Sequence, residues 1–182
     1  MIKNMIDCER DAALKTADLM VAAARTAPKG SGKDKIVSMI LSGEDMNKLA
    51  DEMDKAAVEY NLPFFKRDAD NIRNSHCIVL IGATSVPFGL TDCGMCGFKD
   101  CAEMMKNNAN CAFNITDLGI AVGSAVSVAA NNRIDNRVMY SAGRGAVRMG
   151  LFPEDVRVCY GIPLYTGAKS IYFDRNPGAV LL

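Results

Sequence analysis

Four of the seven cysteines in this 182-residue chain fall within nineteen positions, between Cys93 and Cys111. Their spacing is C-x2-C-x4-C-x9-C, with Cys96 and Cys101 between the two ends. Four thiolates are the number that holds an iron–sulfur cluster or a tetrahedral zinc ion. Residues 92–111, the cysteine-rich segment, therefore predict a metal centre.

The residues around these cysteines suit the convergence of four sulfur atoms. Gly94 and Gly97 each follow a cysteine, and glycine tolerates the positive φ that lets a short loop curl with its N–H groups toward sulfur. Cys101 opens a helical stretch. The turn-prone residues 107–110 then allow the chain to fold back and deliver Cys111.

The identity of the metal follows from what the segment contains. Structural zinc sites usually combine two C-x2-4-C pairs, whereas this segment has one such pair and no histidine. One [4Fe–4S] cluster is therefore the first expectation. Zinc is the chemical alternative, and free or disulfide-forming cysteines are the outcome without a metal.

The composition is that of an ordinary globular chain, with 49% hydrophobic and 23% charged residues. The formal net charge is zero, which gives no reason to expect nucleic acid or an anionic membrane as a partner. The apolar stretch around 117–130 is interrupted by Gly, Ser and Asp, and we expect it to be too short to span a bilayer. An odd number of cysteines and no apolar signal region after Met1 predict reduced thiols in the cytoplasm.

Alternating helix and strand patterns predict an α/β (α+β) sandwich, with a mixed sheet flanked by helices, formed by residues 1–182 as a single domain. Helices are expected over 7–26, from Ser42 to about Tyr60 behind a capping box, over 63–73, over 116–130, and over 141–150. Strands are expected over 36–41, 77–82 and 156–164, with an edge strand over 170–173. The 116–130 helix is dense in small residues, which let another helix approach closely, and Asn114 or Thr116 is expected to cap it.

The cysteine-rich segment resembles the C-G-x-C-G-[FY]-x-x-C motif of [4Fe–4S] domains in corrinoid iron–sulfur proteins, through C-G-M-C-G-F-K-D-C (93–101). Those domains place their fourth cysteine further downstream than Cys111. Over nearly the whole chain the sequence is similar to an uncharacterised prokaryotic family described as containing a ferredoxin domain. The similar stretches are 93–101, F-N-I-T-D-L-G-I-A-V-G-S-A-V (113–126), D-N-R-V-M-Y (135–140) and G-I-P-L-Y-T-G-A-K-S-I-Y-F-D-R (161–175). This resemblance implies an iron–sulfur redox or electron-transfer protein.

The order of the expected elements resembles the flavin-dependent nitroreductase fold. The matching pieces are an A-P loop at Ala27-Pro28 after the first helix, the small-residue helix over 116–130, and a strand that ends in Gly161-Ile162-Pro163. This resemblance implies FMN as a second cofactor. The arginine-rich N-terminal segment that holds the flavin phosphate in nitroreductases has no match in this chain.

Two further groups of residues could bind an anion. Ser141, Arg144 and Arg148, with Gly143 and Gly145 on either side of Arg144, could hold a phosphate or carboxylate at a helix start, although a solvated helix face is the more ordinary interpretation. Lys29 and Lys33 lie in a glycine-rich loop and are a second phosphate candidate, but the loop lacks the Walker pattern.

The remaining cysteines and the single histidine are expected to be structural. His76 and Cys77 could bind metal or act as an acid and a thiolate, but a histidine at a strand edge beside a buried cysteine is more common. Cys8 is expected on a helix face, and Cys159 in a buried strand, where a free cysteine often serves as a core residue.

Three functions remain open at this point. The first is an iron–sulfur electron-transfer protein, with Cys93, Cys96, Cys101 and Cys111 as cluster ligands near the surface. The second is a flavin-dependent nitroreductase-like oxidoreductase, and the third is a zinc-stapled binding protein without enzymatic activity. We also expect a homodimer formed through the 116–130 helix, and an unidentified redox partner.

Overall fold

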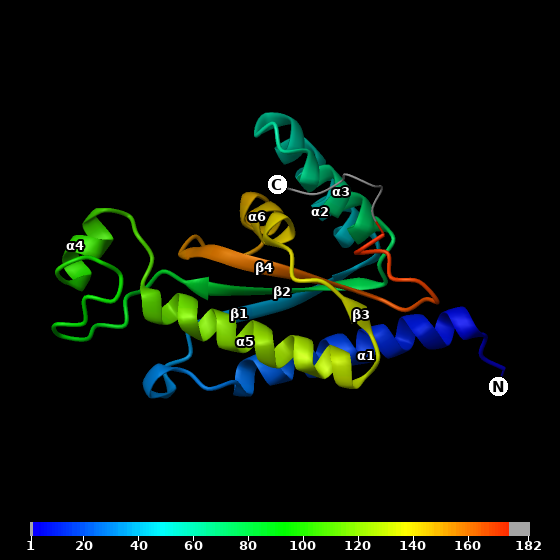
Figure 1. The fold of residues 1–182 in the computed structure, drawn as a ribbon, viewed down its shortest axis with the longest axis horizontal. Coiled ribbons are helices and arrows are strands. Elements are labelled where there is room, and N and C mark those ends of the chain that lie inside the picture. The colour runs from blue at the N-terminus through cyan, green and yellow to red at the C-terminus, as the bar shows by residue number, and fades with distance from the viewer. Residues whose placement is uncertain (1, 175–182) are drawn as a thin grey trace.

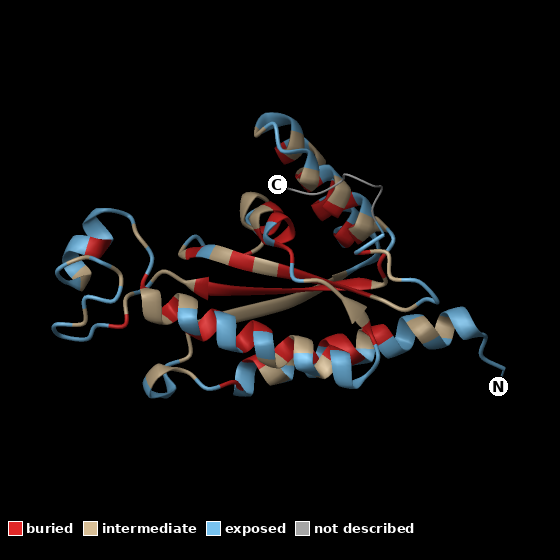
Figure 2. Cartoon of the chain, viewed as in Figure 1, coloured by how far each residue is buried: buried red, intermediate tan, exposed pale blue. Residues whose placement is uncertain are grey.

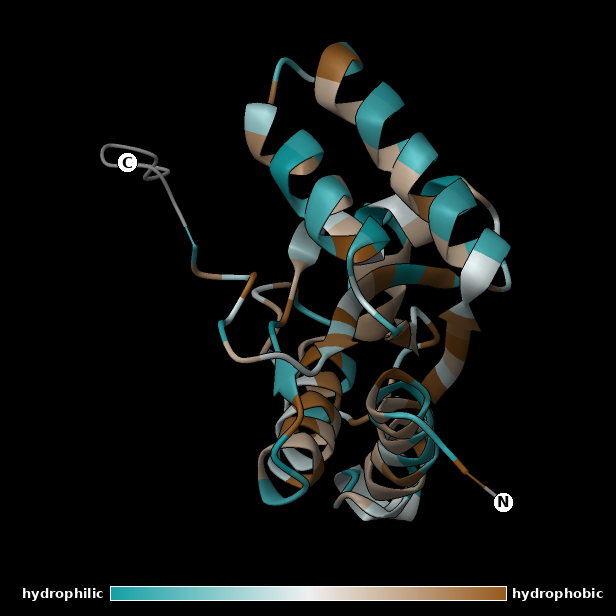
Figure 3. Cartoon of the chain, turned by 90° about the vertical axis from the view of Figure 1, so that its right-hand side faces the viewer, coloured by the Kyte–Doolittle hydropathy of each residue, from teal (hydrophilic) through white to brown (hydrophobic). Residues whose placement is uncertain are grey.

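The computed structural model describes residues 2–174 and places a four-stranded sheet between two layers of helices, as the end-on view in Figure 3 shows. The strands are β1 (Ile36–Ser42), β2 (Cys77–Thr84), β3 (Asp135–Asn136) and β4 (Val156–Tyr165). Their order across the sheet is β1-β2-β4-β3. The α/β sandwich expected from the sequence is confirmed.

Helices cover both faces of the sheet (Figure 1). One face carries α1 (Met5–Thr26) and α5 (Ala112–Asn131), and the other carries α2 (Gly43–Glu59), α3 (Pro63–Arg73) and α6 (Tyr140–Arg148). A short 3-10 turn, η1 (Gly30–Gly32), follows α1, and α4 (Cys101–Lys106) lies beyond one end of the sheet.

The sheet differs in one respect from the expected mixed sheet, because each described pair of neighbouring strands is antiparallel. The reason is the helical hairpin between β1 and β2. A single crossover helix returns the chain for a parallel strand, whereas α2 and α3 cross the sheet twice. The second crossing makes β2 run opposite to β1.

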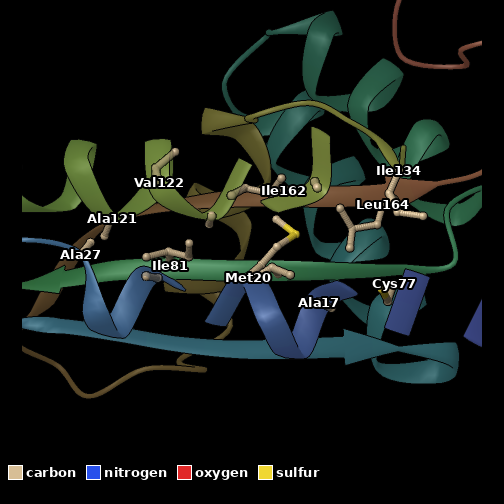
Figure 4. Close-up of a cluster of buried hydrophobic side chains, with 14 of the residues drawn as sticks. Ala17, Met20, Ala27, Cys77, Ile81, Ala121, Val122, Ile134, Ile162 and Leu164 are labelled. Carbon is tan, nitrogen blue, oxygen red and sulfur yellow. The ribbon is translucent and has the colours of Figure 1, made fainter. Parts of the chain in front are cut away.

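The continuous apolar run in β2 is explained by its position at the centre of the sheet, with both faces covered. Successive side chains of a strand alternate between the two faces. Val79 and Ile81 lie in the core beneath α1 and α5, and Ile78 and Leu80 lie in the core beneath α2, α3 and α6. Figure 4 shows the first of these cores, with Met20 between α1, α5 and the sheet.

The long helix α5 begins four residues earlier than the sequence indicated, so Asn114 and Thr116 lie inside it and neither caps it. Its buried residues recur at helical intervals and pack against α1 and the sheet; they include Leu118, Ala121, Val122, Ala125 and Ala129. By length and composition this 20-residue helix could cross a membrane, contrary to the expectation of a stretch that is too short. In this fold it is a core helix that lies beside α1.

Two other expectations differ from the structure. Ser42 forms no side-chain cap, because β1 continues through Ser42, which pairs with Cys77, and α2 starts at Gly43 with a φ of 58°. Residues 170–173 form no strand; Tyr172 turns inward instead, and its hydroxyl lies 2.8 Å from that of Ser75. The edge of the sheet is the short β3.

Candidate metal centre

The cysteine-rich segment connects the end of β2 to the start of α5 and projects from one end of the sandwich (Figure 1). Most of the segment is exposed or half-buried, as Figure 2 shows. Cys93, Cys96 and Cys101 are half-buried, whereas Cys111 is buried. None of the cysteines in the described part of the chain forms a disulfide.

Two glycine turns shape the first half of the segment. Gly94 has a φ of 62° and Gly97 a φ of 82°, which confirms the positive φ expected at both positions. The N–H of Gly97 donates to the carbonyl of Gly94 at 2.9 Å and closes a turn around Cys96. This turn places Cys93 and Cys96 on one compact loop.

The helix α4 then presents Cys101 as its first residue, as the sequence predicted. The side chain of Asp100 accepts the backbone N–H of Glu103 at 2.8 Å and caps the helix. The carboxylate of Glu103 reaches back to the N–H of Lys99 at 2.9 Å. These two bonds fix the position of Cys101 relative to the preceding loop.

A tight turn after α4 returns the chain to the sheet. Asn108 has a φ of 57°, and the N–H of Ala109 donates to the carbonyl of Met104 at 3.1 Å. Cys111 occupies the N-cap position of α5 with no cap bond from its side chain. The thiol is therefore not used as a helix cap.

All four cysteines line one pocket, which has a volume of about 20 Å³. Its other walls are apolar and include Phe88, Met104 and Phe113. The volume corresponds to roughly one water-sized probe. Within the described residues, no three or more His, Cys, Asp or Glu side chains are already close enough to hold a metal ion.

The four cysteine sulfur atoms nevertheless have the chemistry that an iron–sulfur cluster requires of its ligands. Thiolates are the ligands of such clusters, and the pocket is bordered by four thiols. Among the residues that line it, the only other titratable side chain is that of Asp100, which is occupied as the cap of α4. The flanking glycine turns leave the loop able to adjust.

An aromatic pair forms the base of this pocket. The rings of Phe88 and Phe113 stack with centroids 4.8 Å apart and an interplanar angle of 27°. The ammonium of Lys33 lies 5.3 Å from the centroid of Phe88. Together with the buried Met104 and Cys111, the pair forms a small apolar cluster separate from the two main cores.

Two buried polar residues near the start of α5 bind the end of β2 and the turn after α1, and neither contact was predicted from the sequence. The amide of Asn114 donates to the carbonyls of Thr84 and Val86, at 2.9 and 2.7 Å, where β2 ends. The carboxylate of Asp117 accepts the N–H of Gly30 at 3.1 Å. One feature of the sequence could have indicated these contacts. Asn114 and Asp117 are polar residues on the inward-facing side of a helix that is otherwise apolar there.

The anion-binding group expected around Ser141 is not assembled. Ser141 donates to the buried carboxylate of Asp68 at 2.6 Å. Arg148 is bound to Glu52 and Glu59, and hydrogen bonds to Glu59 and then to other neighbours raise its pKa above the usual range. Only Arg144 of the three candidates remains without a hydrogen bond or ion pair to a described residue.

The glycine-rich loop near Lys29 also has a structural role. The ammonium of Lys29 donates to three carbonyls, those of Ala24, Arg25 and Ala27, each at 2.8 Å. These bonds satisfy the C-terminal carbonyls of α1. The ammonium is therefore fully occupied and does not form a phosphate cradle.

His76 and Cys77 do not act together. The Nε2 atom of His76 lies 2.9 Å from the hydroxyl of Thr166, and its ring stacks on Tyr165. Cys77 is fully buried, and burial raises the pKa of its thiol to about 12. Cys159 is buried in β4, as expected, and burial likewise raises its pKa to about 12.

Comparison with known proteins gives one family match and one close relative. Residues 107–175 match the model of a family described as "Uncharacterized protein containing a ferredoxin domain". This matched range includes Cys111 but not the first three cysteines of the segment. A protein of Archaeoglobus fulgidus, described as uncharacterized, is 40% identical over 185 residues, which cover 97% of this chain and 99% of the relative.

Solved structures with a similar fold include nitroreductases. The FMN-dependent nitroreductase of Mycobacterium smegmatis in complex with NADPH matches with a TM-score of 0.58 and 15% identity, over 85% of this chain and 78% of that one. A nitroreductase with bound FMN from Desulfitobacterium hafniense matches with a TM-score of 0.57 and 13% identity, over 86% and 79%. These similarities show that the fold is nitroreductase-like, as expected from the sequence.

Proposed function

This chain belongs to the family of uncharacterized proteins that contain a ferredoxin domain, and we propose that it is an electron-transfer protein with one [4Fe–4S] cluster on its cysteine-rich segment. The proposed ligands are Cys93, Cys96, Cys101 and Cys111. The observation that supports this proposal is that the four cysteines, drawn from two turns and two helix starts, line a single pocket.

Such a cluster accepts or donates one electron at a time, and its potential depends on hydrogen bonds to sulfur, on burial and on local charge. The protein contributes an apolar floor formed by Phe88, Met104 and Phe113, which excludes water from one side. The side chain of Met95 is 56% exposed on the loop. An exposed loop of this kind allows a redox partner to approach the cluster closely.

The cysteine side chains must turn inward for a cluster to form, because the present pocket has room for little more than one water molecule. We propose that the loop from Asp92 to Asp100 makes this adjustment. It contains no regular helix or strand, and three of its residues have positive φ. The α4 cap holds the end of this loop at Asp100, and Asn114 holds the chain at Thr84 and Val86, before the loop begins.

The flavin alternative is supported by the fold alone. The loop at Ala27-Pro28 is present, but the ammonium of Lys29 donates its three hydrogen bonds to backbone carbonyls and has no N–H left for a flavin phosphate. The zinc alternative uses the same four thiols. We rank the cluster first because the segment has one C-x2-C pair rather than two.

We propose that the protein acts as a homodimer in the cytoplasm and that α5 forms the interface. One side of α5 remains exposed and consists of small residues and an isoleucine: Thr116, Gly119, Ile120, Gly123 and Ser127. A Cβ placed on Gly119 or Gly123 would meet nothing within 4 Å. A second copy of the helix could therefore approach the backbone closely.

The deciding experiment is anaerobic purification followed by iron, sulfide, zinc and flavin analysis of the full chain and of single Cys→Ala variants. We expect about four iron and four sulfide per chain, a broad absorbance shoulder, and loss of iron in each variant at 93, 96, 101 and 111. Cys8→Ala and Cys159→Ala are the controls and should retain iron. Stoichiometric zinc without iron, or full iron retention in Cys111→Ala, would contradict the assignment.

A further inference from the structure

A second pocket lies between α6 and the first half of β4, on the sheet face opposite α1 and α5, where Figure 1 shows the two elements together. Its volume is about 330 Å³, within the range typical of small-molecule sites. Tyr140, Arg144, Arg157 and Tyr160 contribute its larger polar side chains. Among the described residues, none with a carboxylate lines it.

Close backbone packing creates this pocket. A Cβ placed on Gly143 would lie 1.7 Å from the carbonyl oxygen of Cys159, and one on Gly161 would lie 2.5 Å from the Cβ of Ala142. The helix therefore rests directly on β4. This contact places Arg144 of α6 and Arg157 of β4 in the lining of one pocket.

The two arginines form an uncompensated positive site. Arg144 is half-buried and has no hydrogen bond or ion pair to a described residue. Arg157 forms no ion pair with the described residues either, and its guanidinium donates one hydrogen bond, at 2.9 Å, to the carbonyl of Asn108. Two guanidinium groups without a carboxylate at one pocket suit an anion with several oxygen acceptors.

The tyrosines add a preference for a flat ring. Tyr140 and Tyr160 line the same pocket, and Tyr140 is 57% exposed with its ring edge against Phe65. Aromatic side chains favour flat apolar groups by stacking. We infer that this pocket binds a small organic anion, a phosphate or carboxylate attached to a flat ring, and that Arg144 and Arg157 hold its charged group.

This anion site adjoins the cysteine-rich segment. Asn108, whose carbonyl accepts from Arg157, lies in the turn that delivers Cys111. An anion held by Arg157 would therefore lie beside a residue that shapes the proposed cluster site. Binding of this anion does not depend on the proposed function.

Binding is tested by isothermal titration of the protein as purified, with its metal content measured, using AMP against adenosine and benzoate against benzamide. We expect at least one anion to bind about tenfold or more tightly than its neutral counterpart, since charge-assisted hydrogen bonds differ by that order. AMP selectivity assigns a phosphate ligand, and benzoate selectivity assigns a carboxylate. Both outcomes support the proposal.

Arg144→Gln is the decisive variant, because the Arg144 guanidinium makes no hydrogen bond or ion pair with a residue between 2 and 174, so its loss should leave the thermal unfolding temperature unchanged. We expect its Kd for the selected anion to rise about tenfold or more. Arg133→Gln removes another exposed arginine, at the end of α5, and should change nothing. Equal affinity for anion and neutral analogue, no anion binding at millimolar concentration, or an unchanged Kd in Arg144→Gln would overturn the proposal.

A result that contradicts the anion site can be distinguished from a result that contradicts the iron–sulfur cluster. Iron retention and the visible spectrum report on the cysteine-rich segment and are measured in the same Arg144→Gln protein. We expect both to match the wild type. Loss of anion binding with intact iron content shows that Arg144 serves the anion site and not the metal centre.

Discussion

The backbone N–H of Gly30 donates to the carboxylate of Asp117, 87 positions further along the chain, at 3.1 Å. A Cβ on Gly30 would lie 2.6 Å from the ring of Phe88, which stacks in turn on Phe113 at the base of the cysteine pocket. A surface turn after α1 is thereby packed against the proposed cluster site. The arrangement explains why a buried acid occurs in the apolar helix α5.

Replacement of Asp117 should separate this turn from α5. We expect Asp117→Ala to lower the free energy of unfolding by about 1–3 kcal/mol, because the N–H of a buried contact loses its acceptor. The Asp117→Asn variant keeps a side-chain oxygen as the acceptor, so its free energy of unfolding should fall by less than half as much. Urea unfolding measures both, with Asp18→Ala on the exposed side of α1 as the control. Equal losses in the Ala and Asn variants would contradict the assigned role.

The contact between Gly143 and Cys159 admits no side chain. We expect Gly143→Ala to cost several kcal/mol or to prevent folding, since a Cβ would overlap the carbonyl oxygen of Cys159 and force α6 off β4. Val58→Ala, at a position of α2 that is 84% exposed, is the control and should leave the stability close to that of the wild type. A thermal melt of Gly143→Ala that matches the wild type would show that α6 can shift without cost.

The sequence predicted the local features of the candidate site well, because they depend on neighbouring residues. The positive φ of Gly94 and Gly97, the start of α4 at Cys101, and the turn before Cys111 are all properties of short stretches. Their proximity in one pocket follows from those same short stretches.

Contacts between distant elements could not be predicted in the same way. The partner of Arg148 is Glu52, 96 positions earlier, and only the packing of α2 against α6 brings them together. Arg144 and Arg157 line one pocket only because α6 packs on β4. The prediction of a mixed sheet was wrong for a related reason. The direction of a strand depends on whether one helix or two helices precede it on the sheet.

The proposed dimer interface on α5 can be tested without disturbing the subunit. Gly123→Arg places a charged side chain into open space in the single subunit but into the interface of the proposed dimer. We expect light scattering to change from a dimer mass to a monomer mass, with the far-UV circular dichroism unchanged. Ala12→Arg on the exposed side of α1 is the control and should stay dimeric. A wild-type monomer at micromolar concentration would rule out the interface.

Two buried thiols outside the cysteine-rich segment, those of Cys77 and Cys159, should make the protein lose stability in alkali. Burial raises the pKa of Cys77 and Cys159 from 9.0 to about 12, so above pH 9 the unfolded chain loses a proton that the folded chain keeps. The unfolded state then binds fewer protons, and stability falls as the pH rises from about 9 to about 12, by at most about 1.4 kcal/mol per pH unit for each thiol.

The Cys159→Ala variant isolates this effect from the titration of lysines and tyrosines. We expect its loss of stability between pH 8 and pH 10.5, measured by urea unfolding, to be about 2 kcal/mol smaller than that of the wild type. Cys8→Ala removes an exposed thiol and should leave the wild-type dependence unchanged. In the folded protein at pH 8, thiol reagents should modify Cys8 but neither Cys77 nor Cys159. Rapid modification of either buried thiol would show that the sheet opens locally far more often than its burial indicates.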